Sequence, residues 1–223
     1  MILSKKDRLD IIYEDKNLIV INKPSGLLTV STEKEKEKTL MHKVISYEKK
    51  KNKNNKVFIV HRLDKDTSGI VVFAKNMKMK NLLQNNWDDL VKLRQYIAIV
   101  EGNPIKEKDT LRSWLKEDKT LRIYSSKKQG DGKLAITKYR LVTKNDKYSL
   151  LEVEIKTGRK NQIRVQLSDI GNPIIGDKKY NSKTNPIKRL GLHANKLVII
   201  NPVTKQEMIF ETDVPQNFIE IIK

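Results

Sequence analysis

A group of reactive side chains lies between two short apolar runs of the sequence. The runs are residues 57–60 and 69–74, and the polar segment between them contains His61, Arg62, Asp64, Lys65, Asp66, Thr67 and Ser68. Functional sites are often built on loops that a rigid scaffold positions, and a carboxylate in such a loop can serve as a nucleophile. The alternative is a polar hairpin loop in which Asp, Thr and Ser bond their own backbone.

A second polar cluster covers residues 157–164 and includes Arg159, Lys160, Gln162 and Arg164. It opens the segment 160–170, in which Ile163, Leu167 and Ile170 recur at spacings of four and three residues, as on one apolar face of a helix. Arg164 follows Ile163 and so lies beside that face. Such an arginine either extends to water or pairs with a carboxylate inside the protein.

The elements that would position these clusters are mainly strands. Apolar or alternating runs predict strands at residues 17–23, 57–60, 69–74, 95–100, 192–200 and 207–211, with three more between 121 and 155. We expect helices at 40–47, 75–90 and 160–170, and solvated loops at the charged blocks 33–38 and 49–56. This pattern predicts an α+β fold with a large mixed, mostly antiparallel β-sheet and flanking helices. We expect residues 1–223 to form a single domain, with no N-terminal accessory RNA-binding domain.

The composition excludes several kinds of chemistry and indicates a polyanionic partner. The chain has 46 Lys and Arg against 27 Asp and Glu, a net charge of +19, which would attract RNA, DNA or an anionic membrane; part of this excess can also reflect a genome poor in G and C. The absence of cysteine excludes disulfides, a thiolate nucleophile and a cysteine zinc site. Neither a His-x-x-x-His pair nor a glycine-rich phosphate loop occurs. No run approaches the roughly 20 apolar residues of a membrane span, so we expect a cytoplasmic protein, and the large charge favours a monomer.

The two clusters together resemble the RluA family of RNA pseudouridine synthases. The contiguous run HRLDKDTSG at 61–69 resembles the family's His-Arg-Leu-Asp-x-x-Thr-Ser-Gly signature. Further segments resemble other family motifs in the same order: NKPSG at 22–26, RQYIAIVEG at 94–102, TGRKNQIR at 157–164 with GNPIIGDKKY at 171–180, and RLGLHANKLVIINP at 189–202. The resemblance implies the pseudouridine synthase fold and an isomerase that converts specific uridines in ribosomal or transfer RNA to pseudouridine.

The resemblance also implies roles for individual residues. It makes Asp64 the essential aspartate, Tyr96 the tyrosine that packs against the target base, and Arg164 the arginine that pairs with the aspartate. Arg62 matches an arginine that helps to extrude the base; the remaining expected RNA contacts are His61, Thr67, Arg159, Lys160 and Gln162. His61 can equally be a hydrogen-bonded structural residue of the loop, and Asp66 is the rival carboxylate. Exchanging an N-glycosidic for a C-glycosidic bond requires no metal and no redox or nucleotide cofactor.

The sequence departs from the family pattern at three positions. Asn161 and Gln166 stand where the family commonly has His, and Arg94 stands where it has Lys; we expect altered contacts and retained chemistry. Two other functions stay open at this level: a non-catalytic RNA-binding or chaperone protein on the same fold, and a hydrolytic N-glycosidase or nuclease. A membrane-surface protein is the weakest alternative because the chain has no long amphipathic basic helix.

Overall fold

The computed structural model describes residues 9–33, 35–126 and 128–223. These residues fall into two compact units. Unit 1 comprises the chain up to Lys92 together with Lys196–Thr212, and unit 2 comprises Leu93–Asn195 together with Asp213–Lys223. Strands β5 (Val91–Glu101) and β10 (Leu192–Ile200) have residues in both units.

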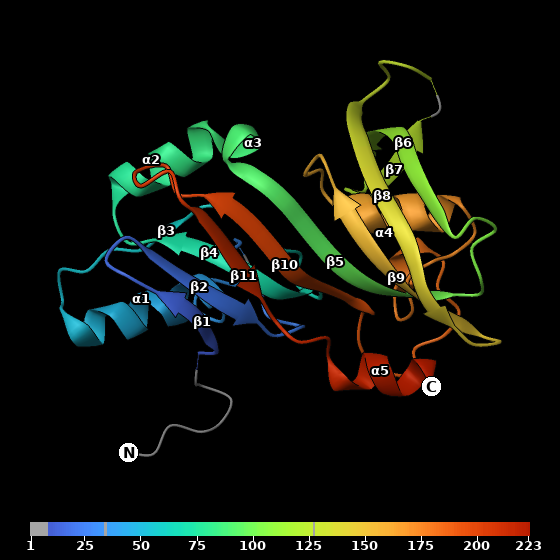
Figure 1. The fold of residues 1–223 in the computed structure, drawn as a ribbon, viewed down its shortest axis with the longest axis horizontal. Helices are drawn as coiled ribbons and strands as arrows, with labels where there is room; N and C mark the ends of the chain where they lie inside the picture. The colour runs from blue at the N-terminus through green and yellow to red at the C-terminus, as the bar shows by residue number, and fades with distance from the viewer. Residues whose placement is uncertain (1–8, 34, 127) are drawn as a thin grey trace. The chain divides into compact units, whose positions relative to one another are not determined.

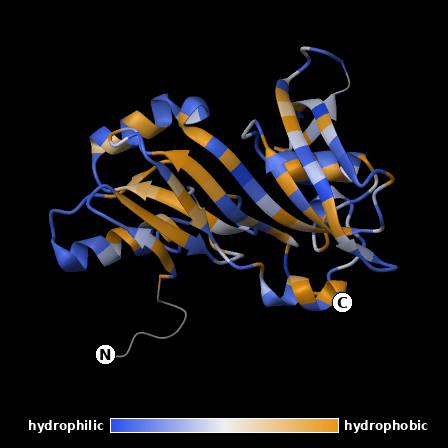
Figure 2. Ribbon diagram, in the orientation of Figure 1, coloured by the Kyte–Doolittle hydropathy of each residue, from blue (hydrophilic) through white to orange (hydrophobic). Residues whose placement is uncertain are grey.

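Unit 1 is built on β1 (Ile11–Glu14), β2 (Leu18–Lys23), β3 (Phe58–Ile59), β4 (Ser68–Ala74), part of β10, and β11 (Glu207–Glu211). The strand order is β1–β2–β4–β10, with β3 paired to β4 and β11 to β10 (Figure 1). In the antiparallel β2–β4 pair, Leu18 lies opposite Ala74 and Lys23 opposite Gly69. Every residue of β4 is buried, which explains why its sequence is a continuous apolar run and not an alternating one (Figure 2).

The helices of unit 1 begin at side-chain caps. In α1 (Leu40–Lys51) the Thr39 hydroxyl accepts a hydrogen bond from the His42 N–H, and in α2 (Met77–Asn85) the side-chain Oδ1 of Asn76 accepts one from the Met79 N–H. Each cap satisfies a backbone donor of the first turn. A short helix, α3 (Trp87–Leu90), follows α2. The prediction of a loop from residue 49 is wrong for Lys49–Lys51, because these lysines form the last turn of α1, where positive charge interacts favourably with the helix dipole.

Unit 2 is an antiparallel sheet with a helix on each face. Its strands are part of β5, β6 (Lys108–Glu117), β7 (Ile123–Ser126), β8 (Lys133–Lys144), β9 (Tyr148–Ile155) and the start of β10, in the order β10–β5–β9–β8–β6–β7. Helix α4 (Gln162–Asp169) contacts β6, β7 and β8 on one face. On the other face, Phe218 and Ile222 of α5 (Gln216–Ile222) form a cluster with Ile97, Ile99 and Leu150. A 3₁₀ turn at Lys178–Tyr180 completes the unit.

The predicted fold class is confirmed, because few helices flank extensive antiparallel β-structure. The strands at 192–200 and 207–211 have the predicted bounds. Strands β1 and β6 and helix α5 were not predicted. Helix α4 begins at Gln162 and not at residue 160, because Asn161 has a left-handed backbone conformation with φ 55°. The expectation of a single domain stays a prediction.

Candidate active site

Asp64 lies in unit 1, in the segment that connects β3 to β4. Asp64 is half-buried, Arg62, Lys65 and Asp66 are exposed, and Leu63 and Thr67 are buried. Asp64 is therefore partly accessible, whereas the residue before it is buried in the protein.

The buried side chain of Lys23, at the end of β2, holds the loop that contains Asp64. Its side chain is fully buried, and its Nζ donates hydrogen bonds to the carbonyl oxygens of Pro24 at 3.0 Å, Leu27 at 2.8 Å and Lys65 at 2.9 Å. An ammonium group has three hydrogens to donate, and a buried cation without such partners would be costly. The ammonium group thus ties the turn after β2 to the residue that follows Asp64.

Further bonds from residues 25–29 fix the backbone on both sides of Asp64. The Thr29 hydroxyl donates to the Leu63 carbonyl at 2.7 Å and accepts from the Leu63 N–H at 3.3 Å. The Gly26 N–H donates to the Lys65 carbonyl at 3.0 Å. Gly26 has φ 82°, which glycine adopts without strain. Because Leu63 and Lys65 are both held, the position of the Asp64 backbone is set before any substrate binds.

His61 and Thr67 support the same loop. His61 Nε2 accepts a hydrogen bond from the Val72 N–H at 3.1 Å, and the ring lies 5.0 Å from that of Trp87. An Nε2 that accepts this bond carries no proton, which favours the structural interpretation of His61. Only 2% of the surface of Thr67 is exposed, and its contact with RNA stays a prediction.

Arg164 lies on α4 of unit 2 and is held by a buried carboxylate. Its Nε and Nη2 donate to the two oxygens of Asp177 at 2.7 Å and 2.8 Å, and its Nη1 donates to Asn161 Oδ1 at 3.0 Å. The Arg164 side chain is 12% exposed and that of Asp177 only 1%. Bidentate pairs of this kind fix the plane of the guanidinium. Arg164 is therefore paired inside the protein and does not extend to water.

Tyr180 and Asn161 complete the surroundings of Arg164. The Arg164 guanidinium lies 5.0 Å from the centre of the Tyr180 ring, within cation–π range. Asn161 Nδ2 donates to the Tyr180 hydroxyl at 2.9 Å, and burial raises the pKa of Tyr180 above its usual value. Asn161, one of the departures from the family pattern, thus links Arg164 to Tyr180.

The other two departures also form internal contacts in unit 2. Gln166 Nε2 donates to the Ser113 hydroxyl at 3.0 Å and to the Ala135 carbonyl at 3.2 Å, so this buried amide connects α4 to the sheet. Arg94 donates to the Lys156 carbonyl at 2.9 Å.

Two of the three residues of unit 2 that are predicted to contact RNA are exposed, and the third is buried. Arg159 and Lys160 are exposed, with Arg159 Nε bonded to the Leu134 carbonyl at 3.0 Å and Lys160 paired with Glu117. Gln162 is only 3% exposed; its Oε1 accepts from the Thr157 hydroxyl at 2.7 Å and from the Arg159 N–H at 3.0 Å. Gln162 therefore shapes the turn before α4, and its contact with RNA stays a prediction.

Tyr96 lies on β5 opposite Val153 and packs, half-buried, against the hydrophobic cluster that includes Val153 and Ile163. It shares unit 2 with Arg164, whereas Asp64 belongs to unit 1. The pairing of Arg164 with Asp64 stays a prediction. The sequence did not predict Asp177, although the segment GNPIIGD that contains it stood out.

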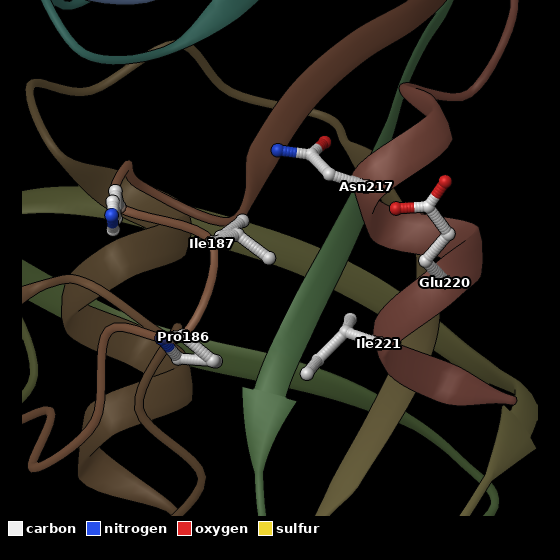
Figure 3. A pocket seen from close by; sticks show the side chains of 6 residues that line it. Pro186, Ile187, Asn217, Glu220 and Ile221 are labelled. Atoms are coloured by element: carbon white, nitrogen blue, oxygen red, sulfur yellow. The ribbon is translucent and has the colours of Figure 1, made fainter.

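One surface pocket of unit 2 involves none of the candidate residues. It has a volume of about 280 Å³ and is lined by Pro186, Ile187, Lys188, Asn217, Glu220 and Ile221 (Figure 3). None of the helices in the described part of the chain is long and apolar enough to cross a membrane.

Comparison with known proteins identifies the family. A sequence model of the RNA pseudouridylate synthase family matches residues 17–169. The chain belongs to this family. It is 33% identical to the uncharacterized RNA pseudouridine synthase YhcT of Bacillus subtilis over 216 residues, which cover 96% of this chain and 71% of the relative. It is 39% identical to the ribosomal large subunit pseudouridine synthase D of Borreliella burgdorferi over 196 residues, covering 85% and 60% of the two chains.

Solved structures agree on the fold of this synthase. Human RNA pseudouridylate synthase domain containing 1 superposes with a TM-score of 0.78 at 21% identity, over 96% of this chain and 87% of that one. Human RNA pseudouridylate synthase domain containing 4 gives 0.76 at 24% identity, over 94% and 90%. The resemblance to the RluA family is confirmed, and with it the reaction class: the chain is an isomerase that converts uridine in RNA to pseudouridine.

Proposed function

We propose that this synthase modifies ribosomal RNA, or as second choice transfer RNA, with Asp64 as the catalytic carboxylate. The observation that carries the proposal is the hydrogen-bonded brace around Asp64. Lys23, Gly26 and Thr29 fix the backbone carbonyls of both neighbours, Leu63 and Lys65, while Asp64 itself stays accessible. A catalytic group gains most when its position is fixed before the substrate binds.

The reaction exchanges one glycosidic bond for another without net loss of atoms. The bond between ribose C1′ and uracil N1 breaks, the detached uracil turns, and a bond forms between C1′ and C5. The proton on C5 leaves and N1 gains a proton. Asp64 can support this exchange as a nucleophile at C1′ or by promoting abstraction of a ribose proton.

In the proposal, Arg164 assists Asp64 and Tyr96 contacts the uracil. Arg164, oriented by Asp177, keeps Asp64 ionised and directed through a charge-assisted bond. Tyr96 offers a flat face to the uracil. Arg62 fills the gap left in the RNA stack, since extruding a base costs a few kcal/mol and the exposed Arg62 can interact with the RNA backbone.

Ribosomal RNA is the first choice of target because relatives such as that from Borreliella burgdorferi are named for the large ribosomal subunit. Exposed cations of this chain can hold RNA phosphates, among them Arg159, Lys160 and the lysines between 49 and 56. We further propose that the enzyme works as a monomer in the cytoplasm.

The test incubates the purified protein with transcribed large-subunit ribosomal RNA or a transfer RNA pool, followed by pseudouridine mapping. We expect new pseudouridine at defined positions with the unaltered protein and with Asp66→Asn, and none with Asp64→Asn. Abasic sites in place of pseudouridine would show a hydrolase. Binding without modification would show a non-catalytic RNA-binding protein, and activity of Asp64→Asn would refute the assigned role.

A further inference from the structure

The sheet of unit 2 has one face that α4 covers and an opposite face that is open around β6, β7 and β8. Leu115, Ile123 and Ala135 point toward α4 and are buried with Val165. Residues on the open face alternate with these, as the period of a β-strand requires. The alternation is visible as changing colour along β8 in Figure 2. Helix α5 packs against the same sheet at β5 and β9, so the region of β6, β7 and β8 stays exposed.

Two aromatic side chains lie on the open face. Trp114 of β6 is half-buried, and Tyr124 of β7 is 41% exposed. Trp114 lies opposite Ser126, and Lys116 lies opposite Tyr124, so the aromatic residues are diagonal neighbours on the same face. Diagonal positions on adjacent strands are about 7–8 Å apart. Aromatic rings that are partly accessible to solvent at this spacing can each stack one unpaired base.

Cations continue along the same face from the aromatic pair. Arg112 precedes Trp114 by two positions on β6, and Lys138 of β8 lies opposite Thr110 on the same face. A third cation, Lys108, lies opposite Arg140. Like charges directly opposite one another destabilise a sheet, and here Glu152 offsets the charge of Arg140 at 3.1 Å, so Lys108 is the cation of this pair without an ionic partner among the described residues.

The carboxylates near this face form ion pairs with cations other than Lys108, Arg112 and Lys138. Glu152 pairs with Arg140 at 3.1 Å, Asp131 pairs with Lys116 at 2.7 Å, and Glu154 pairs with Lys156. Within the described chain, Arg112, Lys138 and Lys108 have no side-chain hydrogen bond or ion pair. All three are exposed. Arg112 therefore places positive charge beside Trp114. Lys138, which lies opposite Glu154, and Lys108 extend this charge farther along the strands.

We propose that this open face, defined by Lys108, Arg112, Trp114, Tyr124 and Lys138, binds a single-stranded part of the substrate RNA. Bases stack on Trp114 and Tyr124, and phosphates contact the three cations. Tyr96 and Arg164 lie on the α4 side of the same sheet, so this surface is separate from the part of the candidate active site that unit 2 contributes. The inference rests on RNA being the substrate. Charge and stacking favour RNA over a protein partner, since a protein would have to supply an unusually acidic surface.

The test measures binding of labelled oligouridine and of large-subunit ribosomal RNA at several salt concentrations. Trp114→Leu keeps an apolar side chain but removes the stacking surface, and we expect at least about fivefold weaker binding, with Trp114→Phe close to the unaltered protein. The pair Arg112→Gln with Lys138→Gln should lower the slope of log affinity against log salt by about 1.4, the value for two single-strand phosphate contacts.

Lys147→Gln with Lys223→Gln is the matched control, because these exposed lysines lie outside strands β6, β7 and β8 and change the net charge equally. We expect this control to change the slope of log affinity against log salt only through the lower net charge of the protein.

In pseudouridine formation, Trp114→Leu should raise KM and leave kcat unchanged. Unchanged affinity and slope in the open-face variants would overturn the inference and leave the proposed role of Asp64 intact. Loss of kcat at saturating RNA would also overturn it. An inactive Asp64→Asn that still binds oligouridine through Trp114 would support the two proposals separately.

Discussion

Replacement of Asp177 by Asn tests whether the buried pair with Arg164 holds unit 2 together and orients the guanidinium. Asp177 is 1% exposed at its side chain and accepts two hydrogen bonds from Arg164 at 2.7 Å and 2.8 Å. Breaking a buried pair by removing one charge costs about 3–5 kcal/mol. Asn retains one acceptor oxygen, so we expect the lower end, a loss of about 3 kcal/mol in the free energy of unfolding.

Urea unfolding measures this loss, and Asp169→Asn is the control. Asp169 is exposed at the end of α4, the helix that carries Arg164. Surface substitutions of this kind change stability by less than about 0.5 kcal/mol. At a temperature where both variants are folded, Asp177→Asn should also lower kcat/KM by about 100-fold, the cost expected for a misplaced group.

A double-mutant cycle with Arg164→Met separates pairing from general destabilisation. Removing both charges should cost less than the sum of the single changes, because neither partner is then left as an uncompensated buried charge. Additive losses, or an Asp177→Asn variant as stable as Asp169→Asn, would refute the reasoning.

Three further changes probe other parts of the account. Lys23→Met leaves the carbonyl oxygens that its ammonium now bonds without a donor, so urea unfolding should show a loss of at least about 1–3 kcal/mol; an unchanged midpoint would contradict the brace. Thr29→Val removes both bonds to Leu63 and should lower kcat more than it raises KM, whereas an effect on KM alone would argue against positioning of Asp64. Burial, with the nearby charge of Arg189, lowers the pKa of His193 from 6.5 to about 4. This neutral histidine favours folding fully above pH 6.5, and its contribution, about 3 kcal/mol, is lost as pH falls from 6.5 toward 4. The stability difference between the unaltered protein and His193→Gln should therefore shrink over that range, and a constant difference would exclude the effect.

The sequence predicted the strands that are apolar runs closed by turn residues. Strand β4 and the buried part of β2 are short apolar runs rich in Val and Ile, and their length, their β-branched residues and the turn residues that flank them favour a strand over a helix. Strand β6 was missed because its buried face contributes only Leu115 as a fully buried residue and its other face has charged residues and Trp114. Helix α5, QNFIEII, is rich in isoleucine and short, so its pattern is ambiguous between helix and strand.

The candidate site was predictable where one contiguous motif carries it. The Asp64 loop stood out because polar residues interrupt two apolar strands. The brace from Lys23 could not be predicted, since Lys65 is 42 positions away along the chain and a buried lysine contradicts the usual preference of this residue for water. Asp177 was missed for a similar reason: its partner is 13 positions away, across a turn that no helical or strand periodicity spans.

Pseudouridine mapping of total RNA tests the central role of Asp64 most directly. Cells with the gene intact, deleted, and restored with either the unaltered sequence or Asp64→Asn are compared. We expect one or more specific pseudouridines to disappear on deletion, to return with the unaltered gene and to stay absent with Asp64→Asn. An unchanged map on deletion, or full rescue by Asp64→Asn expressed at the same level, would contradict the role assigned to this carboxylate.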